Sequence, residues 1–325
     1  MSEKDFDLRI DLTEFSEKIK QVKNEIKKLI IGQDQMIDQI LISLIADGHI
    51  LIEGVPGVAK TLTARLVSQI INTEFKRIQF TPDLMPADII GTSVYNAQKG
   101  SFEFKKGPIF SNIVLIDEIN RAPAKTQSAL FEVMEERSIT VEGKTHQLTE
   151  PFIIIGTQNP IEYEGTYRLP EAQLDRFFFK IDINLPSLEE EIEILNKYNY
   201  QDYKDLLKDV KPCLSTEELL GIRKQINNIH VEKDLIEYIA KIVNETRNNP
   251  DIFLGASPRA SLAILKAAKV FSALNGKDFI TPEDIQYVAI PALIHRIIPS
   301  SEKEIEGIQS IDIIRSIIKK IEIPR

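Results

Sequence analysis

Residues 50–71 read ILIEGVPGVAKTLTARLVSQII, and the architecture of the chain follows from this segment. A short apolar run at 50–52 leads into a loop with Gly54 and Gly57, and apolar residues at helical spacing follow from Leu62. A strand, a glycine-containing loop and a helix in this order bind phosphate through backbone N–H groups and the helix dipole. We predict that Lys60 contacts the β- and γ-phosphates of a nucleotide and that the Thr61 hydroxyl is a ligand of Mg²⁺. The predicted nucleotide-binding residues of this loop are Gly54, Val55, Pro56, Gly57, Val58, Ala59, Lys60, Thr61 and Leu62.

Ala59 departs from the general phosphate-loop pattern, which has glycine at this position. If the position needs a positive φ, alanine strains the loop; if it is helical, alanine costs nothing. The sequence leaves both alternatives open.

A second acidic motif supports the same site. The apolar residues 113–116 run directly into Asp117 and Glu118, the layout of a Walker B strand. Acids at the carboxyl end of a parallel strand lie where ligands bind in such sheets. We predict that Asp117 holds Mg²⁺ through its water shell and that Glu118 orients and polarises the attacking water.

Apolar runs alternate with helix-sized segments over the first half of the chain. This pattern predicts an α/β fold with a buried parallel sheet of five strands. The runs lie at 50–52, 78–80, 113–116, 152–155 and 177–183, after two predicted amphipathic helices within the first 45 residues. Beyond residue 186 the pattern predicts only helices, at 188–198, 216–228, 232–247, 258–274, 282–290 and 309–320. We therefore place a domain boundary near residue 186.

Composition excludes several classes of protein. The 325 residues carry a net charge of −9, which argues against a protein that holds duplex DNA by bulk charge. Cys213 is the single cysteine, so neither an internal disulfide nor a thiolate zinc cluster is expected, and the four histidines show no metal-binding spacing. No apolar run approaches the length of a membrane span and the first residues show no signal peptide. We expect a cytoplasmic protein without membrane insertion.

Taken together, the motifs resemble those of AAA+ ATPases, and specifically of the MoxR family in the helix-2-insert branch, which is related to the magnesium chelatase ATPase subunit. The segments that carry the resemblance are GVPGVAKT at 54–61, LIDEINRAP at 115–123, GTQNP at 156–160, LPEAQLDRF at 169–177 and GASPRA at 255–260. The resemblance implies an AAA+ core at 1–186 with N-terminal helices, a helix-2 insert at about 83–108, a hairpin at about 137–151 that turns at Gly143, and a helical lid at 187–325.

The resemblance also implies roles for residues outside the two phosphate motifs. Asn159 resembles sensor 1, and Arg259 resembles sensor 2. Arg176 resembles the arginine finger that reaches the nucleotide of the next subunit, and Arg168 is a competing candidate for that role. Ile31 and Gly32 resemble the loop that reads the adenine.

Arg259 is also notable on physical grounds. The preceding Ser-Pro pair predicts the start of a helix, so Arg259 places a cation at the positive end of a helix dipole. This is unfavourable unless an anion is bound there, and we interpret it as evidence for a neighbouring phosphate. Whether Arg259 serves its own or the adjacent nucleotide stays open.

By resemblance, the chain is expected to be a homo-oligomer, a hexameric ring, that binds ATP and Mg²⁺ and hydrolyses ATP between subunits. Family members are thought to remodel or mature a protein client, often with metal or cofactor insertion, and the client can be a protein with a von Willebrand A domain. Two alternatives remain: a nucleic-acid-stimulated AAA+ motor, which the charge disfavours, and a nucleotide-gated scaffold.

Overall fold

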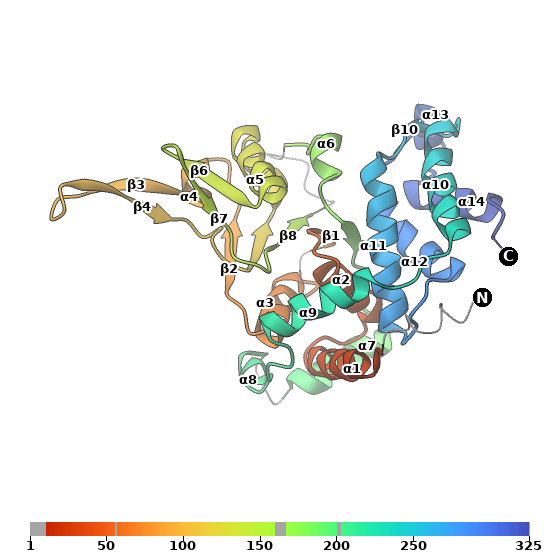
Figure 1. The fold of residues 1–325 in the computed structure, drawn as a ribbon, viewed down its shortest axis with the longest axis horizontal. Helices are drawn as coiled ribbons and strands as arrows, with labels where there is room; N and C mark the ends of the chain where they lie inside the picture. Colours follow the sequence, from red (N-terminus) through yellow and green to blue (C-terminus); the bar gives the residue numbers. More distant parts are fainter. Residues whose placement is uncertain (1–10, 56, 160–166, 200–202, 325) are drawn as a thin grey trace.

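The computed structural model describes residues 11–55, 57–159, 167–199 and 203–324. Its centre is a five-stranded parallel sheet in the order β2-β5-β8-β1-β9 (Figure 1). The strands are β1 Ile50–Glu53, β2 Phe75–Gln79, β5 Ile113–Asp117, β8 Ile153–Gln158 and β9 Phe179–Asp182. Strands β5, β8 and β1 are almost completely buried, as expected for continuous apolar runs covered on both faces. The predicted fold class is confirmed.

Helix α2 lies at the centre of the molecule. The N-terminal helices are α1 Thr13–Lys27, α2 Asp34–Ile45 and α3 Lys60–Ile70. Helix α1 buries one stripe of apolar residues, whereas nine of the twelve residues of α2 are buried. Helix α2 contacts β9 and also two C-terminal helices, α9 Thr216–Asn227 and α11 Pro258–Leu274. A helix that is apolar on nearly all sides needs such surroundings.

The opposite face of the sheet is covered by a second hydrophobic cluster. Its helical part comprises α4 Pro86–Ile90, the short turn η2 Ile119–Arg121, α5 Ala124–Glu136 and α6 Glu171–Leu174. The first cluster is larger, because it joins one sheet face, α1–α3 and the C-terminal helices.

Two antiparallel hairpins extend from the sheet region. In the first, β3 Gly91–Asn96 pairs with β4 Ser101–Lys106, and Figure 1 shows this ribbon pointing away from the body. In the second, β6 Ser138–Val141 pairs with β7 Lys144–Gln147 and the chain turns at Gly143, whose φ is 76°. Both hairpins lie within the segments expected to hold insertions.

The C-terminal half is mostly helical. Besides α9 and α11 it contains α7 Leu188–Tyr198, α8 Tyr203–Lys208, α10 Lys233–Asn248, α12 Pro282–Leu293, α13 Ser301–Ile305 and α14 Ser310–Lys320. Helices α9 and α12 each begin with a capping box, at Ser215 and Thr281 respectively. No helix among the described residues is both long and apolar enough to cross a bilayer.

Three details differ from the sequence expectation. Strand β2 is at Phe75–Gln79 rather than 78–80, because it is an edge strand in which only Ile78 is buried and an apolar run does not mark it. Strand β9 begins two residues later than predicted, at Phe179. In the half predicted to be purely helical, β10 Ile252–Leu254 and β11 Ile298–Pro299 form a short antiparallel ribbon, too brief to give a periodic signal.

Candidate functional site

The carboxyl ends of three neighbouring strands meet at one edge of the sheet. Strand β1 leads into the glycine-containing loop, β5 ends at Asp117, and β8 is followed by Asn159, which is half-buried. Since β5, β8 and β1 are adjacent and parallel, these ends lie side by side. The structure thus brings Lys60, Asp117, Glu118 and Asn159 to the same edge, where ligands bind in open α/β sheets.

The loop glycines serve two different purposes. A side chain at Gly54 would stand 3.2 Å from the carbonyl oxygen of Ile183, so this position needs a small residue because the backbone of the neighbouring segment is close. Gly57 has open space around it but a φ of 92°, so here conformation rather than room requires glycine. Pro56 lies outside the described residues.

The backbone conformation of Ala59 decides between the strained and the helical alternative that the sequence left open. Its φ of 58° and ψ of 20° place it in the left-handed region immediately before α3. The strained alternative is therefore the observed one, at a cost of about 1–2 kcal/mol for an L-residue. Its carbonyl oxygen accepts hydrogen bonds from the Thr63 N–H at 2.9 Å and the Thr63 hydroxyl at 3.0 Å, which hold the first turn of the helix.

The Lys60 ammonium lies across the loop. Its Nζ donates to the carbonyl oxygen of Gly54 at 2.7 Å and lies 3.5 Å from the carbonyl oxygen of Gln158, at the end of β8. These two contacts place the charge between two of the three strand ends. Phosphate oxygens offer a stronger, charge-assisted partner at this point.

A cavity of about 1350 Å³ opens beside Lys60 and Thr61. Of the loop residues proposed from the sequence, Gly57, Val58, Ala59, Lys60, Thr61 and Leu62 line it, as does Ile31. Gly32 is not among the described lining residues: its φ is 71°, and a side chain there would collide with the Glu190 carboxyl group. The 31–32 break therefore packs tightly against the start of α7.

The far wall of the cavity was not anticipated from the sequence. Its apolar residues are Leu29, Ile30, Leu185, Pro186, Ile194, Leu195 and Tyr198, five of them on or just before α7, and Glu191 and Asn199 also line the cavity. The Tyr198 hydroxyl donates to the carbonyl oxygen of Leu29 at 3.0 Å and ties α7 to the 29–31 segment. Exposed apolar residues on α7, such as Leu195 at 66% exposure, were the available signal. An apolar wall facing a polar loop suits a purine base joined to a triphosphate.

Asp117 is buried and carries two hydrogen bonds. The Arg77 Nε donates to its Oδ2 at 2.5 Å from β2, and the Thr157 hydroxyl donates to its Oδ1 at 3.1 Å from β8. The carboxylate and the Thr61 hydroxyl offer oxygen donors of the kind that Mg²⁺ takes together with water and phosphate. The residues present therefore fit a magnesium ion bound with a nucleotide, although no group of three acidic, histidine or cysteine ligands occurs in the described ranges.

Glu118 is held by a residue that sequence reasoning missed. The Gln79 side-chain amide donates to Glu118 Oε2 at 2.6 Å, and the Arg121 Nε lies 3.2 Å from the same oxygen. Glu118 itself has a φ of 56°, and its N–H donates to the Thr157 hydroxyl. Non-glycine residues in this conformation concentrate at functional sites. The register pairs Gln79 with Asp117, a placement that no sequence pattern indicated.

The three candidate arginines lie elsewhere. Arg176 and Arg259 both contact Glu135 of α5, with Nε–Oε2 at 3.3 Å and Nη2–Oε1 at 2.6 Å respectively. Neither is among the described residues that line the cavity beside Lys60. Arg168 is 81% exposed and pairs with Glu171 at 3.1 Å. Glu135 is therefore the anion at the positive end of α11, and it belongs to the same chain.

Comparison with known proteins gives consistent matches. The pattern of the ATPase family associated with various cellular activities (AAA) matches residues 49–179, and that of the AAA lid domain matches 244–317. The chain is 45% identical to the uncharacterized protein YeaC of Bacillus subtilis, over 92% of each chain. It is 41% identical to the chaperone MoxR1 of Mycobacterium tuberculosis, over 93% of this chain and 81% of that one. A crystal structure of a protein from Cytophaga hutchinsonii superposes with a TM-score of 0.89 at 42% identity, over 97% of each chain.

Proposed function

The chain belongs to the MoxR family of AAA+ ATPases, and we propose that it hydrolyses ATP in a ring of identical subunits and uses the cycle to remodel a partner protein. The observation that carries this proposal is the division of the charged groups: Lys60, Asp117 and Glu118 lie at the same edge of the sheet, whereas Arg176 and Arg259 both pair with Glu135 of α5.

Within one subunit, each strand end has a separate task. The loop amides and Lys60 bind the phosphates, while the apolar wall holds the adenine. Asp117 and Thr61 hold Mg²⁺, which neutralises charge on the phosphates when bound. Glu118 accepts a hydrogen bond from the attacking water and orients it, and the Asn159 amide assists from the neighbouring strand. The chemistry is mostly positioning and charge neutralisation.

The pairing of the arginines supports a ring. A guanidinium that contributes to hydrolysis has to reach a γ-phosphate, and Arg176 and Arg259 pair with Glu135 of α5 rather than with a residue of the strand ends that carry Asp117 and Glu118. We propose that Arg176 acts on the nucleotide of the adjacent subunit, that Arg259 reaches the same nucleotide, and that the ring is a hexamer. In this arrangement each active site is completed by the neighbour.

A protein client is supported by the first hairpin. Tyr95 and Phe102 form an edge-to-face pair at 5.4 Å on the β3–β4 ribbon and are 57% and 67% exposed. Exposed aromatic pairs on a projecting ribbon suit protein contact. The relative from Mycobacterium tuberculosis is named a chaperone. We propose that this ribbon contacts a client protein; a von Willebrand A domain protein carries over from the family resemblance as the first partner to examine.

The test combines size and turnover. The Glu118→Gln variant should bind ATP, form a ring in light scattering with Mg²⁺-ATP, and show no hydrolysis. The Arg176→Ala variant should lose about 10³-fold in kcat and should inhibit wild-type protein beyond its molar share when mixed with it. Arg168→Ala tests the competing candidate and should behave as wild type; the reverse pattern, with the loss at Arg168 and not at Arg176, would contradict the assignment of Arg176. A chain that stays monomeric while hydrolysing ATP at full rate contradicts the ring.

A further inference from the structure

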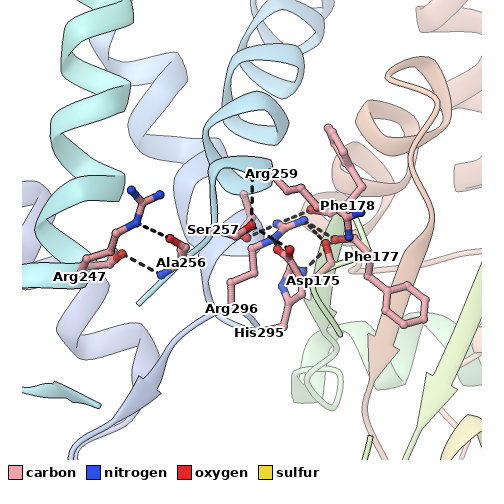
Figure 2. Close-up of polar contacts among 11 residues, drawn as sticks. Asp175, Phe177, Phe178, Arg247, Ala256, Ser257, Arg259, His295 and Arg296 are labelled. Atoms are coloured by element: carbon pink, nitrogen blue, oxygen red, sulfur yellow. Dashed lines mark hydrogen bonds and ion pairs between the residues drawn. The ribbon is translucent and has the colours of Figure 1, made fainter. Parts of the chain in front are cut away.

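Arg296 is a buried cation that the proposed reaction does not use. It lies three residues beyond the end of α12, and its side chain is 3% exposed. All five of its N–H donors are used (Figure 2). Nε donates to the Asp175 carboxylate at 2.8 Å. Nη1 donates to the carbonyl oxygen of Phe178 at 3.2 Å and to that of Ala292. Nη2 donates to the carbonyl oxygen of Asp175 at 3.0 Å and to that of Phe177 at 2.6 Å.

The acceptors of Arg296 surround one residue. Apart from Ala292, they belong to Asp175, Phe177 and Phe178, so the contacts lie on both sides of Arg176 in the chain. The buried His295 adds another, because its Nε2 donates to the carbonyl oxygen of Phe177 at 3.0 Å. The backbone that carries Arg176 is thus fixed by two consecutive residues of the C-terminal helical region.

The same carboxylate links this segment to Arg259. The Ser257 hydroxyl donates to Asp175 Oδ2 at 2.8 Å and accepts the N–H of Arg259 at 3.1 Å (Figure 2). Asp175 therefore connects Arg296 with the first turn of α11. Arg176 and Arg259, which both pair with Glu135, therefore each lie within two residues of a member of this hydrogen-bond network: Arg176 follows Asp175, and Arg259 lies two residues after Ser257.

Stability alone does not account for a network of this kind. Removing an arginine and a carboxylate from water costs about as much as their attraction returns, and apolar replacements of similar volume are often neutral or stabilising. What a guanidinium with five directed bonds adds is a defined geometry of the oxygens around it.

We propose that Arg296 is a positioning residue for Arg176, which makes hydrolysis in the adjacent subunit depend on the position of the C-terminal helices. This rests on the proposed role of Arg176 in the neighbouring active site. A shift of α12 moves Arg296, and Arg296 moves the 175–178 segment with it. A displacement of about 1 Å at a catalytic group can cost about 10²-fold in rate.

The primary variant is Arg296→Lys, which keeps the charge but has three donors in place of five. We expect its kcat for ATP to fall ten- to a hundredfold while its KM stays within twofold, since its own cavity is intact. Arg247→Lys is the matched control: the Arg247 Nε donates to the carbonyl oxygen of Ala256 at 2.7 Å, within the C-terminal region and away from residues 175–178 (Figure 2). This control should keep the wild-type kcat.

Mixed rings separate positioning from a general structural defect. Glu118→Gln subunits cannot hydrolyse ATP but carry an intact Arg176. Mixing them with Arg296→Lys subunits should raise turnover per Arg296→Lys subunit at least fivefold, because that subunit's pocket then receives a properly placed arginine. Arg176→Ala, mixed in the same way, is the benchmark and should be rescued too.

The outcomes are distinct. If Arg176→Ala is rescued and Arg296→Lys is not, the positioning role is wrong and the proposed function stands. If Arg176→Ala is not rescued, the role of Arg176 between subunits fails and the inference fails with it. If Arg296→Lys does not fold, Asp175→Asn replaces it, since the amide keeps the size of the side chain but offers one acceptor oxygen in place of two and carries no charge. An unchanged kcat in that variant also overturns the proposal.

Discussion

The buried His49 should make the fold sensitive to mild acid. Its Nε2 lies 3.1 Å from the carbonyl oxygen of Met134 and its Nδ1 lies 3.0 Å from the Ile154 nitrogen. The carbonyl can only accept and the N–H can only donate, so the ring is the neutral tautomer with its proton on Nε2. Protonating Nδ1 would break the bond to Ile154. Burial, followed by the nearby Arg137 charge, lowers the pKa of His49 from 6.5 to about 4.

The direction in which stability changes with pH follows from the number of protons that the folded and unfolded chains bind. Below pH 6.5 the unfolded chain takes up a proton at His49 that the folded chain does not, so stability falls as the pH drops towards 4 and then levels off. The pKa difference corresponds to about 3 kcal/mol in full, of which about 2 kcal/mol is lost between pH 7 and pH 5. Burial also lowers the pKa of His295 well below its usual value, which adds a loss of the same sign.

The assay is urea unfolding between pH 5 and 7, followed by circular dichroism because the chain has no tryptophan. His49→Asn keeps an acceptor for the Ile154 N–H and cannot titrate. It should be less stable than wild type at pH 7 but should lose about 2 kcal/mol less on going to pH 5. His230→Asn, at an exposed histidine, is the control and should keep the wild-type slope. Equal slopes for His49→Asn and wild type would refute the reasoning.

Three further predictions concern the candidate site. Ala59→Gly removes the strain of an alanine in the left-handed region but also increases the conformational entropy of the unfolded chain. The net effect should be a rise of about 0.5–1 kcal/mol in the free energy of unfolding, measured with urea. A loss of stability would contradict the strain. Gln79→Glu replaces the amide donor to Glu118 Oε2 with a second carboxylate, so kcat should fall about tenfold in a steady-state ATPase assay, and an unchanged kcat speaks against a role for the contact. Lys60→Ala should weaken ATP binding about a hundredfold or more in calorimetry, and retained affinity excludes the assigned phosphate contact.

Motifs that are contiguous in sequence predicted the centre of the site well. The apolar runs before Gly54 and Asp117 are buried parallel strands, and a parallel sheet brings their ends together without further information. For the same reason Asn159 could be placed next to them. The assigned roles of these residues stay predictions.

Residues whose partners are distant in the chain could not be predicted from the sequence. Arg77 and Gln79 come from an edge strand with a weak apolar signal, and only the strand register places them against Asp117 and Glu118. Arg296 is far in sequence from the 175–178 segment that it fixes. Arg259 was expected to lie beside a phosphate, but in this structure the anion beside it is the Glu135 carboxylate of the same chain, and pairing across the fold leaves no local sequence pattern.

The central position of α2 has a consequence for how the protein is made. Helix α2 ends at Ile45, yet α11, one of the helices that covers it, is complete only at Leu274. At a synthesis rate of about 5–20 residues per second, the ribosome needs about 10 to 50 seconds to add the intervening residues. During that interval the nascent chain carries an apolar helix that α11 does not yet cover, so the packing around α2 is completed only after residue 274 has been added.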